Sequence, residues 1–418
     1  MFNFAKSLNS IMKKVAGTLF LFISITLILS GCQKLLTPLP ADDELLDGPV
    51  EGLTAEQNSQ FLAGDVAFND DVFTAENGLG PYFGAPSCGS CHAGDGKGHP
   101  STTFTRFGQS DSTGNQYLSF GGPQLQNRAI PGYTPETIPA GASSAKFLPP
   151  INTGLGFLAA LTDDQVLSNA DPLDADGNGI SGVPNYISAP WYFTPQFYHQ
   201  AFAGKYIGRF GKKATSIDLL QQVVIAFNED IGVTSEYAPE EPAINGIASP
   251  YPDNVPDPEV TTNTILNLVF YLRTLKAPVQ RNQEDADVIA GSELFETFKC
   301  VQCHISEWIT PQSDISALSN ITFKPYTDLL LHDMGPGLDD GYTEGTAKTS
   351  EWRTAPLWGL GLARFSQGGQ YYLLHDGRAA SIDEAILFHG GEALVSRNLY
   401  GASSEADKQK LIKFLESL

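Results

Sequence analysis

Two pentapeptides of the pattern CxxCH carry the clearest chemistry in this sequence. Thiols at this spacing can add across the two vinyl groups of a haem, and the histidine that follows can bind the iron. The alternative is zinc binding, but closed zinc sites usually bring their cysteine pairs within a few tens of residues, and these pairs lie more than two hundred residues apart. The sequence therefore predicts two covalently bound haem c groups, on Cys88, Cys91 and His92 and on Cys300, Cys303 and His304.

Short helices must position these motifs. The 418 residues include 41 Gly and 27 Pro with only 17% charged residues, a composition typical of short helices joined by long irregular loops. We expect a mainly α fold with two cytochrome c-like domains, at residues 55–279 and 280–418. Apolar periodicity and helix-capping residues predict helices at residues 154–167, 216–231, 261–275, 291–298 and 405–418. A Pro- and Glu-rich surface loop is expected at 239–258.

The first residues have the layout of an exported lipoprotein. Three lysines precede an apolar run at residues 15–29, which is short for a membrane span. The last leucine of this run begins the tetrapeptide Leu-Ser-Gly-Cys at residues 29–32. This ending resembles the lipobox of bacterial lipoproteins, in which Cys32 bears the lipid. The alternative is a plain signal peptide with an incidental cysteine. We expect residues 1–31 to be a signal peptide and 32–54 a tether to a bacterial membrane, with the domains facing the periplasm or the cell surface.

Charge and cysteine count narrow the partners. The formal net charge is −22, which argues against nucleic acid; an acidic surface suits a basic electron donor or simply keeps the protein soluble. Of the five cysteines, four belong to the CxxCH motifs and the fifth is Cys32, so no pair remains for a structural disulfide.

Residues 174–179 follow the pattern D-x-D-x-N-G, which opens an EF-hand calcium loop. Asp174, Asp176 and Asn178 would bind through side chains and Ile180 through its carbonyl. The twelfth position is Asn185 instead of the bidentate Glu of the full motif. An Asp- and Gly-rich surface turn is therefore the alternative to a calcium site.

Other motifs give the chain a resemblance to a known family. They are GLGP at 78–81, DADGNGISG at 174–182, GRFG at 208–211, LHDMG at 331–335, EWRTAPLWG at 351–359 and HDGR at 375–378. With them the chain resembles the bacterial di-haem cytochrome c peroxidase superfamily, and more closely its di-haem oxidoreductase branch, also labelled thiol oxidoreductases. The resemblance covers nearly the whole chain after the leader. It implies two mainly helical cytochrome c domains whose haems differ in role.

The resemblance implies that the C-terminal haem receives electrons, with His304 and Met334 as its axial ligands. A thioether opposite histidine raises the reduction potential and closes the iron to substrate. Met334 is the only one of three methionines outside the leader. Its neighbour His332 is the rival ligand, and packing in the core is the alternative role for Met334.

The N-terminal haem, on His92, is by the same resemblance the peroxidatic one. Peroxide cleavage needs a displaceable sixth ligand and a distal acid that moves a proton. In the peroxidases this acid is a glutamate near a helix end. Asp230 takes that position here, with a side chain one methylene shorter, and Glu229 is the second choice. Solvated surface carboxylates are the alternative.

Other residues could serve the haems. Arg209, Arg353 and Arg378 are candidates for pairing with haem propionates, because guanidinium binds carboxylates in bidentate fashion. His375 and His389 could orient propionates or bind iron, although structural roles are the simpler interpretation. The four tryptophans are candidates for an electron path between haems, and most are expected in the core: Trp191, Trp308, Trp352 and Trp358.

Two functions compete at this point. The first is an exported enzyme that takes electrons from a soluble donor of small cytochrome or cupredoxin type and reduces peroxide or a related oxidant. The second is a non-catalytic electron carrier that serves a membrane or metal-uptake partner. Thiol oxidation has no support from spare cysteines. The sixth ligand of the His92 haem distinguishes the first two.

Overall fold

The computed structural model describes residues 41, 45–108, 117, 120–242, 253 and 255–418. By its internal contacts the chain divides into two units, Met1–Leu45 and Leu46–Leu418. The predicted signal peptide and Cys32 lie outside the described residues. Within the described part, no helix has the length and apolar character needed to cross a membrane. The larger unit is described below.

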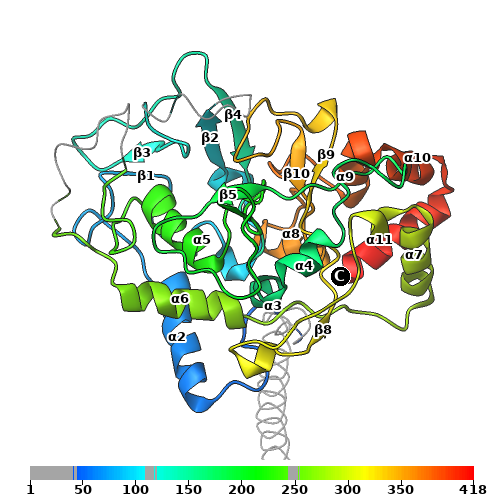
Figure 1. Cartoon of the computed structure of the whole chain (residues 1–418), viewed down its shortest axis with the longest axis horizontal. Coiled ribbons are helices and arrows are strands. Elements are labelled where there is room, and N and C mark those ends of the chain that lie inside the picture. The colour runs from blue at the N-terminus through cyan, green and yellow to red at the C-terminus, as the bar shows by residue number, and fades with distance from the viewer. Residues whose placement is uncertain (1–40, 42–44, 109–116, 118–119, 243–252, 254) are drawn as a thin grey trace, which may run out of the picture. The chain divides into compact units, whose positions relative to one another are not determined.

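The larger unit is rich in helices and contains small strand pairs (Figure 1). The helices are α2 (Ala55–Asn69), α3 (Leu155–Ala160), α4 (Asp163–Leu167), α5 (Leu219–Ile225), α6 (Thr262–Thr274), α7 (Ala286–Thr297), α8 (Ala363–Ser366), α9 (Ile382–Phe388), α10 (Leu394–Ala402) and α11 (Glu405–Ser417). A π-helical segment, Ala226–Ile231, continues α5. The antiparallel strand pairs are β1 (Tyr82–Phe83) with β3 (Arg128–Ala129), β2 (Phe104–Gly108) with β4 (Ser143–Phe147), β5 (Tyr186–Ser188) with β6 (Lys205–Ile207), β7 (Trp308–Ile309) with β8 (Thr322–Phe323), and β9 (Leu331–Asp333) with β10 (Glu351–Arg353).

The predicted helices form, with boundaries set by caps. Thr261 caps α6, and the last predicted helix is α11, whose cap is Ser404. The helix predicted at 154–167 is split, because Leu161 is extended and Thr162 starts a new helix with a capping box to Gln165. The helix predicted at 216–231 begins at Leu219 and ends at Gly232, whose positive φ of 74° ends it.

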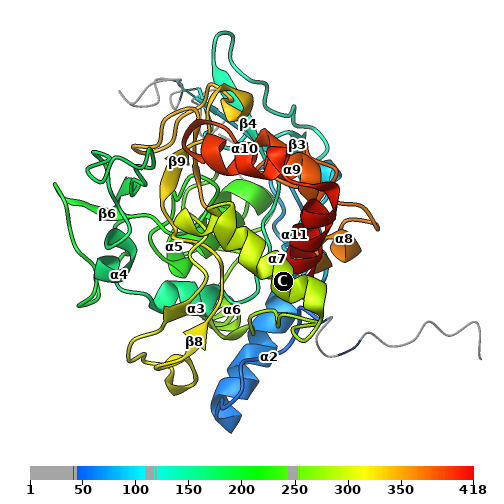
Figure 2. The same ribbon diagram turned by 90° about the vertical axis from the view of Figure 1, so that its right-hand side faces the viewer.

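Two helix pairs repeat one design around the two CxxCH motifs. α2 packs against α6 in the first half of the chain, and α7 packs against α11 in the second (Figure 1). In the view of Figure 2, α11 lies near α9 and α10, and α9 contacts both of them. Each pair thus joins a helix that precedes a CxxCH motif to a helix that closes the same half.

Each helix pair is close enough to need a glycine. A Cβ atom on Gly64 of α2 would lie 2.2 Å from the carbonyl oxygen of Asn267, and one on Gly291 of α7 would lie 2.2 Å from that of Lys410. Both distances are shorter than a non-bonded contact allows. The same internal spacing therefore recurs in both halves, which supports duplication of one unit.

The hydrophobic core has two main parts. The larger includes Val50, Phe68 and Leu268, and it also takes in Trp308 and Trp358 from beyond residue 280. The smaller lies within the second half and is built on residues such as Phe295 and Phe414 of the α7/α11 pair. The chain segments on the two sides of the predicted boundary at 279/280 therefore share a core, and the boundary itself stays a prediction. Residues 46–54, predicted as the end of the tether, belong to the larger unit.

Candidate haem sites

The first CxxCH motif forms a tight turn. The backbone N–H groups of Cys91 and His92 both donate to the carbonyl of Cys88, at 3.1 and 3.0 Å. The His92 Nδ1 atom lies 2.9 Å from the carbonyl oxygen of Pro150, so Nδ1 carries the proton and Nε2 keeps its lone pair. Burial lowers the pKa of His92 to about 4. The imidazole is therefore neutral at physiological pH, as an iron ligand must be.

The second motif has the same local geometry. The N–H of His304 donates to the carbonyl of Cys300 at 3.0 Å, and Nδ1 of His304 lies 2.8 Å from the carbonyl oxygen of Tyr326. Burial lowers the pKa of His304 to about 4. An aromatic ring from the preceding helix lies beside each histidine, with centroids 5.9 Å apart for Phe68 and His92 and 6.2 Å for Phe295 and His304. Both histidines are thus oriented with one nitrogen available.

A cavity of about 310 Å³ adjoins the first motif. Its wall combines the two thiols and the imidazole with aliphatic and aromatic side chains from separate parts of the chain. These include Phe68, Phe147, Leu148, Leu155, Leu158, Phe227, Leu268, Leu272 and Trp358. A flat apolar ring system bound through two thioethers and one imidazole matches this lining.

Three cations in the same wall lack a carboxylate partner within ion-pair distance in the described part of the chain. They are Lys97, Lys212 and Arg353. Burial lowers the pKa of Lys97 to about 8 and that of Arg353 to about 10, and it also lowers the pKa of Lys212, which is further lowered by Lys97 and Arg353. Unpaired charges in an apolar wall are costly. The two propionates of a haem would supply the missing negative charge, so these residues fit the group.

The other predicted propionate partners are already paired. Arg209 also lines the cavity, but its guanidinium is buried against the carboxylate of Asp163. Arg378 pairs with Asp340 at 2.8 Å and with Asp376 at 2.7 Å. Arg353 is therefore the only one of the three predicted arginines that faces the cavity without a carboxylate partner among the described residues.

The two predicted acids, Asp230 and Glu229, lie in different surroundings. Asp230 lines the cavity together with His92, and burial, reinforced by the negative charge of Glu229, raises the pKa of Asp230 to about 7. Glu229 is not part of the wall and pairs instead with Arg106 at 3.1 Å. Arg106 also pairs with Glu344, which reaches the cavity from the second half of the chain. Of the two predicted acids, Asp230 is thus the one that lines the cavity.

Gln124 also lines the cavity, although the sequence did not predict it as a site residue. It is 2% exposed, and its Nε2 has no hydrogen-bond partner among the described residues. Its Oε1 accepts a long hydrogen bond of 3.5 Å from Arg106. A buried amide donor without a partner is costly, and a polar ligand in the cavity would satisfy it. Gln124 lies in a stretch without helical period, so no pattern marked it.

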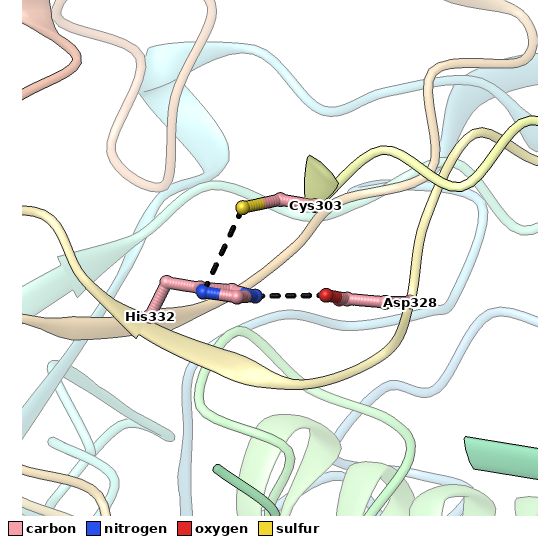
Figure 3. A group of neighbouring side chains, drawn as sticks. All are labelled: Cys303, Asp328 and His332. Atoms are coloured by element: carbon pink, nitrogen blue, oxygen red, sulfur yellow. Dashed lines mark hydrogen bonds and ion pairs between the residues drawn. The ribbon is translucent and has the colours of Figure 1, made fainter. Parts of the chain in front are cut away.

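His332, the predicted rival ligand, is fully engaged (Figure 3). Its Nε2 lies 2.8 Å from Asp328 Oδ2 and its Nδ1 lies 2.7 Å from Glu392 Oε2. Burial opposes a charge on His332, but the hydrogen bonds to Asp328, Cys303 and Glu392 outweigh it and raise the pKa to about 12. With both nitrogens protonated, this imidazole has no lone pair for iron.

Met334 and His389 are the other candidates for the sixth ligand of the second haem. Met334, like Phe388, packs against a cluster that includes Trp352. His389 follows Phe388, and its Nδ1 lies 2.8 Å from the carbonyl oxygen of Ala385, which leaves Nε2 without a partner among the described residues. Burial lowers the pKa of His389 below its usual value, so its ring is neutral at physiological pH. His389 therefore has the tautomer and the charge state of an iron ligand.

The predicted calcium loop brings together a set of residues that differs from the prediction. Carboxylate oxygens of Asp171, Asp174 and Asp176 lie within 4.8 Å of one another. Asn178 instead accepts a hydrogen bond from the N–H of Ile180 at 2.7 Å, as in a local turn. Asn185, the twelfth position, is buried and donates to the carbonyl of Lys213 at 2.6 Å. Asp171 thus replaces the later predicted positions in this cluster.

The structure leaves fewer tryptophans as candidates for an electron path between the haems. Trp191 is 76% exposed, whereas Trp308, Trp352 and Trp358 are buried. Trp358 lines the first cavity, and the chain around it, at residues 355–363, also reaches the second core through Leu357 and Leu360. Trp358 is therefore the tryptophan of the first cavity wall, and its chain neighbours pack on the second core.

One family of known proteins matches the chain. The sequence model of the family described as "Di-haem oxidoreductase, putative peroxidase" matches residues 145–418, which is more than half of the chain. The chain belongs to this family. Membership supports haem cofactors and a di-haem redox role. The matched region contains Cys300, Cys303 and His304, whereas the first CxxCH motif precedes it.

Solved structures resemble the chain only distantly. Hydrazine synthase of Kuenenia stuttgartiensis, pressurised with 20 bar xenon, is 14% identical with a TM-score of 0.38, and the match covers 91% of this chain and 93% of that one. A MauG-like protein associated with microbial copper homeostasis is 15% identical with a TM-score of 0.31, covering 70% of this chain and 94% of that one. No curated protein matches the chain. These likenesses are too distant to bear on function.

Proposed function

We propose that this protein is an exported di-haem c-type oxidoreductase that takes electrons from an external donor and reduces peroxide or a related oxidant. When bound, the haems would supply one-electron transfer and, at the iron held by His92, cleavage of the peroxide O–O bond. The reaction consumes two electrons and two protons and releases two waters. The observation that carries the proposal is Asp230, an acid with a raised pKa in the wall of the same cavity as His92.

Protein groups around the cavity have separable roles. Asp230 would take a proton from the bound peroxide and return it to the leaving oxygen, because a pKa of about 7 suits both directions of transfer. The Nε2 amide of Gln124 would donate a hydrogen bond to the substrate. Arg106 pairs with Glu229, and its positive charge partly offsets the rise in the pKa of Asp230 that burial and Glu229 cause. The Pro150 carbonyl fixes the ring of His92.

The second haem would relay electrons, and its sixth ligand is either Met334 or His389. Met334 remains the ligand that the family resemblance implies. The Nε2 of His389, which has no partner among the described residues, supports the alternative. Either ligand would close the iron to substrate, which is what a relay requires. Trp358, which lines the first cavity, would shorten the path to the first haem.

Redox-titrated absorption spectra of the haem-loaded protein, recorded with and without peroxide, test this function. We expect two haems with different potentials, of which one responds to peroxide once the other has been reduced. Two low-spin haems that stay inert to peroxide in every redox state would contradict the enzyme and favour the electron carrier, serving a membrane or metal-uptake partner. Replacing Asp230 with Asn provides the matched variant, since the amide keeps the shape and loses the proton chemistry.

Export and anchoring are part of the same proposal. Covalent attachment of haem c in bacteria takes place outside the cytoplasm, which suits a leader at residues 1–31, and a lipid on Cys32 would hold the protein to the membrane. The donor would be a soluble small cytochrome or cupredoxin. A Cys32→Ala variant should move from the membrane fraction to the soluble fraction while keeping both haems. Retention in the membrane would contradict the anchor.

Calcium at the aspartate loop completes the proposed cofactors. Asp171, Asp174 and Asp176 offer three carboxylates on a Gly-rich turn, and Asp176 is exposed, so an ion there would exchange with solvent.

A further inference from the structure

We propose a second divalent-cation site, specific for calcium, formed by the carboxylates of Glu241, Asp253, Asp257 and Glu259. One oxygen from each of the four lies within 4.8 Å of the others. The sequence suggested only a Pro- and Glu-rich surface loop here, because the four acids are spread over nineteen positions without a motif. The fold brings them together between the π-helical segment Ala226–Ile231 and α6.

Buried oxygens without partners point to a ligand at this site. Asp253 is only 7% exposed, and although its Oδ1 accepts from the N–H of Val255 at 2.8 Å, its Oδ2 is buried with no partner among the described residues. Both carboxylate oxygens of Glu241 and Oε1 of Glu259 are likewise buried with no hydrogen-bond partner among the described residues. Carboxylate oxygens shielded from water and left unpaired are costly. A cation among them would remove that cost.

No basic side chain is available to neutralise the cluster locally. The sequence contains no Lys, Arg or His between Lys213 and Arg273. None of the ion pairs among the described residues involves these four acids. The polar contacts that hold the cluster are neutral: Thr234 donates to Glu259 Oε2 through its N–H and its hydroxyl, both at 2.7 Å, and its hydroxyl lies 3.3 Å from Asp257.

Without a cation the cluster must hold protons. Burial, followed by the charges of Glu259, Asp257 and Asp253, raises the pKa of Glu241 to about 8. Burial also raises the pKa of Asp253 and of Glu259. A bound cation would therefore compete with protons for these oxygens.

The ligand chemistry selects calcium. All four side chains offer hard oxygen atoms, with no sulfur or imidazole in the cluster. Calcium accepts six to eight oxygens in flexible geometry, so backbone carbonyls and water can complete the shell. Magnesium requires near-ideal octahedral geometry at shorter distances and gives up its water reluctantly. A site built on four carboxylates spread over residues 241–259 suits the larger ion.

Described residues beside the site connect it to the segments of the first cavity. Asn228, next to Glu229 and Asp230, donates to the carbonyl of Glu240 at 3.0 Å. Glu259 packs against Gly78, because a Cβ atom added to Gly78 would lie 2.2 Å from Cγ of Glu259. Gly78 begins the segment that leads into the first CxxCH motif. An ion here would therefore stabilise the segments on both sides of the first cavity.

Calcium titration calorimetry on the haem-loaded, chelator-treated protein tests the site. Measured near pH 7 in two buffers of different ionisation enthalpy, wild-type protein should bind calcium at this site with release of about one proton. The Glu241→Gln/Asp253→Asn double variant should lose this binding event and its proton release. The control is the Asp174→Asn/Asp176→Asn variant, which changes the exposed aspartate loop. It should keep this calcium-binding event and its proton release.

Two results would overturn the proposal. The first is proton-coupled calcium binding that persists in the Glu241→Gln/Asp253→Asn variant. The second is wild-type protein that binds no calcium beyond what the Asp174→Asn/Asp176→Asn variant loses. Folding is checked by the absorption spectrum of both haems. If the double variant does not fold, terbium luminescence is measured on wild type and on the Asp174→Asn/Asp176→Asn variant. The terbium signal must persist in the Asp174→Asn/Asp176→Asn variant. Calcium must compete it away, and an equal concentration of magnesium must not.

Discussion

His332 and Asp328 are joined by a hydrogen bond of 2.8 Å between Nε2 and Oδ2, and both side chains are buried. Because Glu392 engages the other ring nitrogen, His332 acts as a charged structural residue. Replacing it with Ala should lower the free energy of unfolding by about 3–5 kcal/mol, the usual cost of breaking a buried pair. The absorption spectra of both haems should stay the same. Denaturant unfolding followed by circular dichroism measures the first effect, and loss of a low-spin haem would contradict the assignment.

The sixth ligand of the second haem can be decided by two parallel substitutions. If Met334 binds the iron, Met334→Ala should lower the potential of one haem and remove the thioether-to-iron absorption at the red end of the spectrum. If His389 binds it, His389→Ala should convert that haem to high spin, and Met334→Ala should change only stability. Redox-titrated spectra of both variants distinguish the outcomes. A variant pair with two unchanged haems would exclude both residues.

Covalent attachment predicts separable losses of haem. Cys88→Ser/Cys91→Ser should remove one of two covalently bound haems and leave the other, and Cys300→Ser/Cys303→Ser should do the reverse, because each thiol pair serves one group. Haem staining after denaturing electrophoresis and the haem-to-protein ratio measure this. Full haem content in either variant would show that the thiols are not the attachment points.

The glycines at the two helix crossings should be intolerant of a methyl group. Gly64→Ala and Gly291→Ala each place a Cβ 2.2 Å from a backbone carbonyl, so the helices must separate, at a cost of about 1–3 kcal/mol or more. Gly401 in α10 is the control, since a Cβ there meets nothing within 4 Å. Gly401→Ala should stabilise the protein by about 0.4–1 kcal/mol. Thermal unfolding of the three variants gives the comparison, and equal melting temperatures would contradict the close packing.

Sequence reasoning reached the features that lie in short or periodic stretches. The CxxCH motifs are local, and apolar periodicity with capping residues predicted 261–275 where α6 runs Thr262–Thr274. Gln124 and Lys212 meet His92 only through tertiary structure, and neither lies in a recognisable motif. The acids between 241 and 259 suggested a surface loop, yet Asp253 is buried.

The pairing of Gly64 with Asn267 and of Gly291 with Lys410 shows how the two halves share a design with few identical residues. What the halves share is a close helix crossing and an aromatic ring one turn further on, at Phe68 or Phe295. A single glycine and a single aromatic residue satisfy this geometry. The remaining helix positions are free to diverge, so few identical residues remain to compare.

The pKa of Asp230 makes the proposed chemistry depend on pH. Asp230 must be ionised to take a proton from peroxide, and burial raises its pKa to about 7. The second-order rate constant for peroxide should therefore rise with pH and level off above about 7. Asp230→Asn should lower it by about 10² to 10⁴-fold and flatten the profile. Glu229→Gln, which alters the acid paired with Arg106, should keep a pH-dependent limb moved to lower pH, because one negative neighbour is gone.

The same shift has a predictable sign for stability. A carboxyl whose pKa is raised in the folded state binds more protons there than in the unfolded chain, so its contribution to stability falls as pH rises from about 4 to about 7. Asp230→Asn removes this penalty and should gain stability relative to wild type above pH 7, with little difference below pH 4. Stopped-flow kinetics and unfolding curves across this range measure both effects. A peroxide rate with no dependence on pH, in a variant series that is otherwise folded and haem-loaded, would remove Asp230 from the reaction.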